Sequence, residues 1–312
     1  MNPPTERMTL RARTPEDLLA LVPVVLGFEP AESLTLLSFE GRRPFHARID
    51  LPAREHDEDA IQALVDPVVQ HAVSLVAVIV HSHERARAAE VGGRLLEALA
   101  GREVAVIDVL LTDGRCWATL DAAAGPWTAY DVSAHPFVVQ AVVRVDVMHG
   151  SREELAASLD PDPRRVERVT ALDEDGADQP GPVGTWLAHL VSECLARSGV
   201  PRDDECARLL TWLDRPDGVD AVIDLVEPGT AAQHADLWRA VLRAAPESQR
   251  DLPAMVMALC AWLAGHGALA WCALDRLSPE AAEQGLARAV RTALERAVPP
   301  DAWWQAELGD PA

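Results

Sequence analysis

The chain has 312 residues, a formal net charge of −21 and 49% hydrophobic residues. This length is enough for two domains, and the hydrophobic fraction is enough for buried cores. Acidic residues outnumber basic ones by 49 to 28, so we expect no nucleic-acid-binding surface. No uncharged apolar run reaches the roughly 18 residues that a membrane span needs, so none is predicted.

All 28 basic residues are arginine, because the chain contains no lysine. The chain alone therefore cannot form a lysine Schiff base or supply the lysine of a phosphate-binding loop. We predict no cofactor. The five cysteines are scattered without C-x-x-C spacing, which favours free thiols in a reducing compartment. Since the first residues also lack the apolar core of a secretory signal, we expect a cytoplasmic protein.

A capped helix is predicted at the start of the segment TPEDLLALVPVVLGFEPAESLTLLSFEG, residues 14–41. Thr14 can accept hydrogen bonds from the first turn, and Pro15 suits the first helical position. Pro23 has no N–H to donate, so we expect a kink or a restart there. Gly27 is placed to end the helix in the left-handed conformation, with Phe28 packing back.

A hairpin is predicted next, with strands at residues 34–39 and 45–51. His46, Arg48 and Asp50 alternate with apolar residues, so they share one face that is solvated or lines a cleft. The functional hypothesis is an anion site with Arg48 as donor, because guanidinium groups match oxyanions well. The alternative is a solvated ion pair.

The connection before this hairpin also carries candidate residues. Glu32 and Ser33 lie in a short polar loop, and loops on rigid scaffolds often carry function. We place both at the mouth of a pocket; the alternative is a helix-to-strand corner without a ligand. The candidate ligand-binding residues are therefore Glu32, Ser33, Arg48 and Asp50.

Two continuous apolar runs, at residues 75–80 and 104–111, predict strands that are buried on both faces. A helix predicted at 83–100 separates them. Strand, helix and strand at this spacing require a crossover, so the two strands should be parallel. A further strand at 116–120 follows an Asp-Gly turn. The N-terminal half is thus predicted to be an α/β domain with a mixed sheet.

A metal site is the alternative reading of this half. His81 and His83 follow a buried strand, and alternate residues of an extended segment point the same way. Asp108 and Asp113 are the candidate further ligands. Such a site would indicate a metal-assisted hydrolase, whereas the competing interpretation is an ordinary helix start. No G-x-S-x-G or H-E-x-x-H motif is present, so an enzyme is neither predicted nor excluded.

The second half is predicted to be all-helical. Residues 160–182 are charged, rich in proline and poor in apolar residues, so we predict a partly disordered acidic linker there. The predicted domains are then 1–159 and 183–312. Helices are expected at 185–198, 203–213, 218–225, 231–244, 252–264, 268–277 and 279–297. Helices joined by short loops pack antiparallel, and their grooves offer a surface for a protein partner.

Several segments resemble an actinobacterial family known as domain of unknown function 4192. They are LLALVPVVLGFEPAESLTLL, RIDLP, VLLTDGRCW, SREELAASLDP and AWLAGHGALAWCALDR. The chain departs from the family pattern after DGR, where the expected Cys-Cys-Pro cluster is missing. The resemblance implies no activity. We therefore expect a non-enzymatic module for protein interaction or small-ligand binding, with the metal-assisted enzyme as the alternative.

Overall fold

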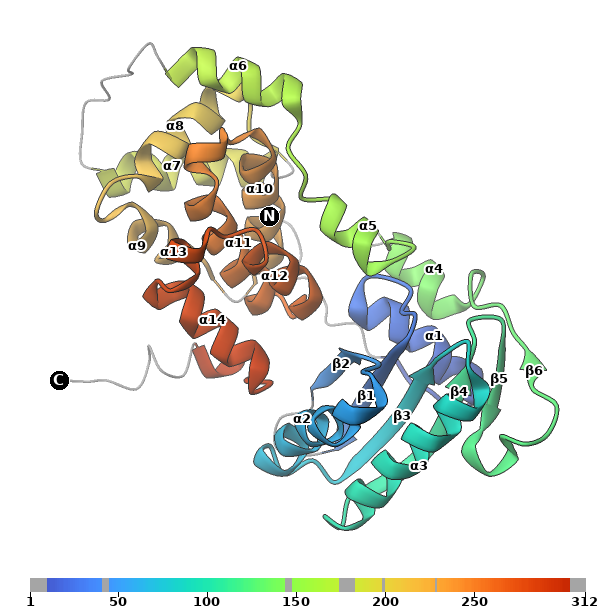
Figure 1. Ribbon diagram of the computed structural model, residues 1–312. Helices are drawn as coiled ribbons and strands as arrows, with labels where there is room; N and C mark the ends of the chain where they lie inside the picture. The colour runs from blue at the N-terminus through green and yellow to red at the C-terminus, as the bar shows by residue number, and fades with distance from the viewer. Residues whose placement is uncertain are drawn as a thin grey trace. The chain divides into compact units, whose positions relative to one another are not determined.

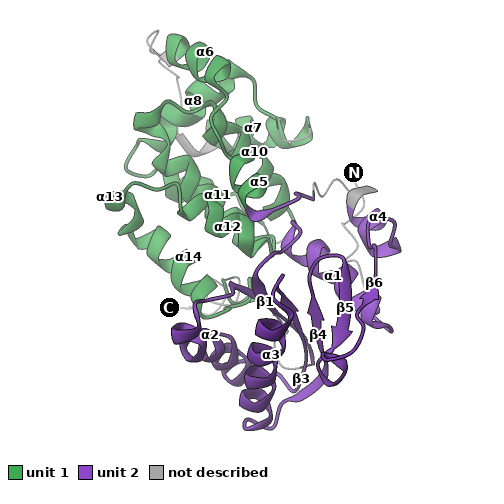
Figure 2. Cartoon of the chain, turned by 45° about the vertical axis from the view of Figure 1, so that its right-hand side comes forward, with its two compact units in different colours: residues 1–6, 153–312 green, residues 7–152 purple. Residues whose placement is uncertain are grey.

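The computed structural model describes residues 10–40, 45–143, 148–173, 183–197, 200–227 and 229–303 (Figure 1). The chain divides into two compact units, one of residues Arg7–Arg152 and one formed mainly by Glu153–Ala312 (Figure 2). The first has a mixed sheet with helices, and the described part of the second is built from helices. The predicted fold class is confirmed. Among the described residues, no helix is long and apolar enough to cross a membrane.

The first unit, called the α/β unit below, is organised around one sheet. Its strands lie in the order β2-β1-β3-β4-β5-β6, with β3 and β4 parallel as predicted and the other neighbours antiparallel. The strands are β1 Ser33–Glu40, β2 His46–Asp50, β3 Leu75–His81, β4 Ala105–Thr112, β5 Cys116–Thr119 and β6 Thr128–Ala129. The helices are α1 Pro15–Leu26, α2 Asp57–Gln70, α3 Arg85–Ala100 and α4 Pro136–Val143, with 3-10 turns at Arg54–His56 and Leu120–Ala122.

Helix α1 begins and ends as its sequence predicts. The Thr14 side chain accepts from the N–H of Asp17, and the Asp17 carboxylate accepts from the N–H of Thr14. At the other end Gly27 has φ +79°, and its N–H donates to the carbonyl of Pro23. The helix continues through Pro23, so the predicted restart does not occur. Buried leucines on the preceding turn pack on the sheet and hold the helix across the missing hydrogen bond.

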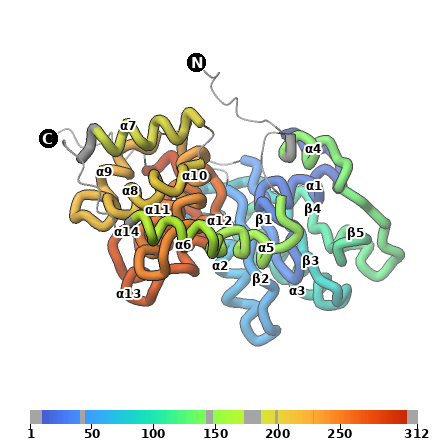
Figure 3. The backbone as a smooth tube through the Cα atoms, turned by 90° about the horizontal axis from the view of Figure 1, so that it is seen from above, coloured from blue at the N-terminus to red at the C-terminus, as the bar shows by residue number. Residues whose placement is uncertain are grey.

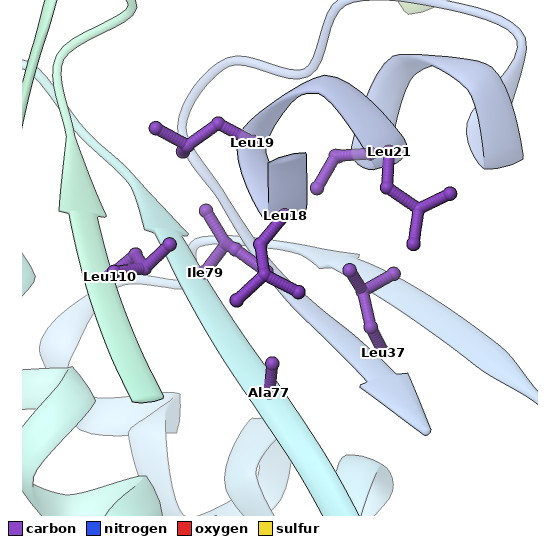
Figure 4. Close-up of a cluster of buried hydrophobic side chains, with 8 residues drawn as sticks. Leu18, Leu19, Leu21, Leu37, Ala77, Ile79 and Leu110 are labelled. Atoms are coloured by element: carbon purple, nitrogen blue, oxygen red, sulfur yellow. The ribbon is translucent and has the colours of Figure 1, made fainter. Parts of the chain in front are cut away.

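Helix α1 covers one face of the sheet, and α2 and α3 lie on the other (Figure 1). Figure 4 shows side chains of α1 pointing at three strands; the buried residues are Leu18, Leu19, Leu21, Val22, Leu37, Ala77, Ile79 and Leu110. Helix α4 lies beside α1, as Figure 3 shows, and its Phe137 packs against the same cluster. This apolar packing fixes the sheet face on which the polar residues described below lie.

The opposite face requires close approach of α3 to the sheet. A Cβ added at Gly92 would lie 3.2 Å from Val109 Cγ1 and 3.3 Å from Leu111 Cδ2, so only a small residue fits. A buried ion pair joins α3 to α2, with Arg87 Nη1 2.7 Å from Asp57 Oδ2. Both contacts hold α3, and with it the connection that leaves the end of β3.

The second unit, called the helical unit below, packs around α11. Its helices are α5 Arg152–Ala157, α6 Pro163–Asp173, α7 Val183–Ala196, α8 Asp203–Leu213, α9 Gly218–Ile223, α10 Ala231–Ala244, α11 Asp251–Leu263, α12 Gly267–Leu274, α13 Pro279–Ala282 and α14 Gly285–Glu295, with a 3-10 turn at Glu247–Gln249. All residues of α11 from Pro253 onward are buried, which marks it as the centre of the bundle.

One helix of this unit lies inside the segment predicted to be a linker, residues 160–182. Helix α6 occupies Pro163–Asp173, its Val169 is fully buried, and its Arg165 bonds to Asp203 of α8. Asp162 accepts from the N–H groups at the start of α6, and proline at the first position is a further start signal. These helix-start signals were not recognised in the sequence, because the segment is rich in charged residues. Residues 174–182 lie outside the described residues.

Candidate functional site

A row of polar side chains crosses the sheet at the carboxyl end of β3. The strand register places Ser33 of β1 opposite both Asp50 of β2 and His81 of β3. Residues directly opposite in neighbouring strands have side chains on the same face. His81 lies opposite Thr112 of β4, so the row continues across the parallel pair. Open α/β sheets bind their ligands at the carboxyl ends of such strands.

Arg48 and Thr35 form the next pair along the same face. The Arg48 side chain is only 11% exposed, and its Nη1 lies 2.5 Å from Asp50 Oδ1. Its Nη2 donates to the carbonyl of Ala31 at 3.2 Å. The guanidinium carbon lies 5.6 Å from the ring centroid of Phe28, which is buried. Arg48 is therefore held under an aromatic ring, with two of its three nitrogens bonded.

Four neighbouring side chains on this face have a polar atom with no hydrogen-bond partner among the described residues. The atoms are Ser33 Oγ, Thr35 Oγ1, Arg48 Nε and His81 Nε2, and we call these four residues the polar cluster. Ser33 and Thr35 are fully buried, and His81 is 6% exposed. A buried polar group without a partner costs about 1–3 kcal/mol, and most interiors avoid it.

His81 is held in its neutral form. Burial, reinforced by the positive charge of Arg48, lowers the pKa of His81 to about 3. At neutral pH one ring nitrogen is then a donor and the other an acceptor. Arg48 is consequently the charged member of the polar cluster.

Glu32 shapes the connection beside the cluster. It has φ +35°, an uncommon conformation for a residue other than glycine. Its carboxylate accepts from the N–H of His83 at 2.7 Å and from Ser82 Oγ at 3.0 Å, so it joins the α1–β1 connection to the end of β3. The side chain of Glu32 is therefore already bonded. Its residue and the neighbouring Ala31 are exposed, so the cluster lies close to the surface.

The structure brings the predicted ligand-binding residues together. Ser33, Arg48 and Asp50 share one sheet face, and Glu32 lies directly before Ser33. Thr35 was not among the predicted site residues, and His81 was predicted only as a metal ligand. The signal for Thr35 was its alternation with Ser33. This alternation points to the site only when the register of the hairpin is known. The register pairs Thr35 with Arg48, and this pairing was not predicted.

The structure does not bring together the residues of the alternative metal site: among the described residues, no group of three or more His, Cys, Asp or Glu is placed to hold a metal ion. The strand ends at His81, which is buried, and the chain bends at His83, which is exposed. The two histidines therefore do not share a face. The carboxylates have other roles: Asp108 accepts from the N–H of Val109, and Asp113 accepts from two N–H groups of the β4–β5 turn.

Comparison with known proteins assigns a family but no activity. A search of curated proteins and a search of solved structures found no significant match. A family model described as domain of unknown function, DUF4192, matches residues 15–301. This match covers both units, and it confirms the family resemblance seen in the sequence. The chain therefore belongs to the DUF4192 family.

Proposed function

We propose that the α/β unit is a non-enzymatic module that binds a small polar ligand at the polar cluster. One observation carries this conclusion: four buried polar atoms without a partner gather on one sheet face, at the end of β3. Interiors normally pair such atoms, and a bound ligand is one explanation for a group of atoms left unpaired. A ligand that supplies the missing hydrogen bonds would recover their cost.

The arrangement favours binding over catalysis. Ser33 lies opposite His81, as a nucleophile and its base would, but Ser33 Oγ and His81 Nε2 both lack a partner and so are not bonded to each other. With a pKa of about 3, His81 is also a weak base at neutral pH. An activated serine nucleophile is hydrogen-bonded to its base, and that base can accept a proton at neutral pH.

Hydrogen exchange of the full chain tests this function. Neutral sugars, amino acids, carboxylates and phosphates are added in separate classes, and exchange of the β1 and β3 amides is followed by mass spectrometry. We expect at least one class to slow exchange in these strands. Ser33→Ala should abolish the protection. Ser38→Ala is the matched control, because Ser38 is a buried serine of the same strand whose hydroxyl is bonded to the backbone of Phe45.

Two results together would overturn the function. One is the lack of protection by every class of compound. The other is a native mass spectrum in which the chain as isolated carries no small molecule. Protection that persists in Ser33→Ala would show binding elsewhere on the chain and would equally reject the polar cluster as the site.

The compartment and the partner remain part of the proposal. The five cysteines are free, and four of them are buried; this fits a reducing compartment, so we place the protein in the cytoplasm. A protein partner for the helical unit stays a prediction.

A further inference from the structure

We propose that the ligand of the polar cluster presents an oxyanion, a carboxylate or a phosphate, to the N–H of Arg48 Nε and the hydroxyls of Ser33 and Thr35. This inference rests on the proposed binding function and names the chemical class of its ligand.

The free groups are mainly donors. Arg48 Nε can only donate a hydrogen bond, and the two hydroxyls can each donate one. Thr35 lies directly opposite Arg48, and Ser33 is the next residue along on the same face. Side chains in such positions lie about 4.5–8 Å apart, within reach of a group that has two or three acceptor oxygens. An oxyanion fits three convergent donors better than a neutral hydroxyl does.

The guanidinium group of Arg48 is already paired, and only its Nε is left to bond a ligand. Arg48 is the cationic member of the cluster, and its field is felt at His81, which stays uncharged. Of the two nearby carboxylates, Asp50 pairs with Nη1 of Arg48 itself and is 70% exposed on its side chain, and Glu32 is bonded to Ser82 and His83. The nitrogen Nε is thus left for an incoming group.

Anion binding elsewhere on the chain is disfavoured. At a formal net charge of −21, the molecule as a whole repels anions, so non-specific anion binding is not expected. Inside the cluster the donors are buried, and hydrogen bonds between ionised partners are stronger there than in water. Anion binding at this site would therefore depend on the donors themselves.

Isothermal titration of the full chain tests the inference. The protein is kept in a chloride buffer without oxyanions and is titrated with inorganic phosphate, acetate and the neutral compound glycerol. We expect phosphate or acetate to bind and glycerol not to; which anion binds separates the two sources of the oxyanion. Thr35→Val and Arg48→Gln should each lower the affinity about tenfold or more.

Arg54→Gln is the matched control, because Arg54 is a half-exposed arginine of the same unit that is paired with Glu90. Its anion affinity should equal that of the parent chain. Arg48→Gln can be affected in folding, so Thr35→Val, which removes only an unbonded hydroxyl, gives a second independent reading. Anion binding that survives Thr35→Val and Arg48→Gln alike would overturn the inference.

The remaining outcomes distinguish this inference from the function it rests on. Neutral compounds that protect β1 in the exchange experiment, with no binding of phosphate or acetate, would reject the oxyanion and leave the binding function standing. No binding of any probe, together with no protection by any class, would reject both and leave buried water as the partner of the cluster.

Discussion

Two buried charged side chains, one in each unit, differ in how they are bonded. In the helical unit, Glu205 is 1% exposed and accepts from the N–H of Arg202 at 2.8 Å, from Arg197 Nη2 at 2.6 Å and from Arg202 Nη2 at 2.9 Å. The thiol of Cys194 also donates to it. In the α/β unit, Arg48 Nε has no partner among the described residues, and the hydroxyls of its neighbours Ser33 and Thr35 have none there either.

This difference separates structural from functional burial. A buried polar network whose members are all bonded rigidifies the fold, whereas one with unbonded members weakens it. The Glu205 network joins α7 to the start of α8, so its role is complete within the unit. The unbonded atoms of the polar cluster lower stability without an equivalent structural role. Substitutions in the two networks should therefore change stability in opposite directions.

The largest effect is expected from Glu205→Ala. The variant loses the acceptor at the start of α8 and leaves two guanidinium groups without their carboxylate. Because these groups are partly exposed, we expect a loss of about 2–4 kcal/mol, below the upper range for a broken buried pair. Hydrogen exchange of the α8 amides measures this loss as a lower free energy of local unfolding. The control Glu193→Gln alters an exposed carboxylate of α7 and should change the free energy of local unfolding of α8 by less than about 0.5 kcal/mol. Equal effects of the two substitutions would contradict the structural role of Glu205.

The next effect concerns acid. Because the pKa of His81 is about 3 in the folded chain and about 6.5 in the unfolded one, the unfolded chain binds the extra proton between these values. The contribution of His81 is fully present above pH 6.5 and falls by about 1.4 kcal/mol per pH unit below it. The protection free energy of the β3 amides, corrected for the pH dependence of intrinsic exchange, should therefore decrease between pH 6 and 4.

His81→Gln should flatten this dependence in β3, and the exposed His83→Gln should not. An unchanged slope in His81→Gln would show that His81 is not the group responsible.

The Glu205 network responds to acid at a lower pH. Burial raises the pKa of Glu205, but the N–H of Arg202 and the guanidinium groups of Arg197 and Arg202 outweigh it, so the pKa lies below its ordinary 4.5. Its contribution is present above that value and is lost as the pH falls through the lowered pKa.

The fold could be predicted largely from local signals. The α1 ends follow from Thr14 and Gly27, and the parallel pair follows from two apolar runs joined by a helix. Helix α6 could not be predicted, because Val169 is an isolated buried residue among charges and composition does not show what it packs against.

The site could be predicted only in part. Alternation in β2 identified Arg48 and Asp50 as residues of one face, and this was enough to propose an anion site. The grouping with Thr35 and His81 depends on the register between three strands, which a single sequence does not contain. The shared face of His81 and His83 could not be predicted for a related reason: extended geometry was assumed to continue to His83, but the strand ends at His81.

A smaller loss is expected from Thr112→Val. Thr112 is fully buried, and its hydroxyl donates to the carbonyl of Cys116 at 3.0 Å, accepts from the N–H of Gly114 at 3.0 Å and contacts Tyr130 Oη at 2.9 Å. Valine keeps the shape but removes these bonds, and the N–H of Gly114 loses its acceptor. We expect a loss of about 1–2 kcal/mol, measured by hydrogen exchange of β4 and β5.

Thr35→Val gives the smallest change and the sharpest comparison. Thr35 matches Thr112 in residue type, in burial and in sheet, but its hydroxyl has no partner among the described residues. Valine of nearly the same shape removes an unbonded polar group, so without ligand we expect the β1 amides to gain up to about 1 kcal/mol of protection. The same variant should bind oxyanions more weakly, which links the cost of the cluster to its use. A loss of stability comparable to that of Thr112→Val would show that the Thr35 hydroxyl is already bonded, to buried water, and that the polar cluster is a complete network like that of Glu205.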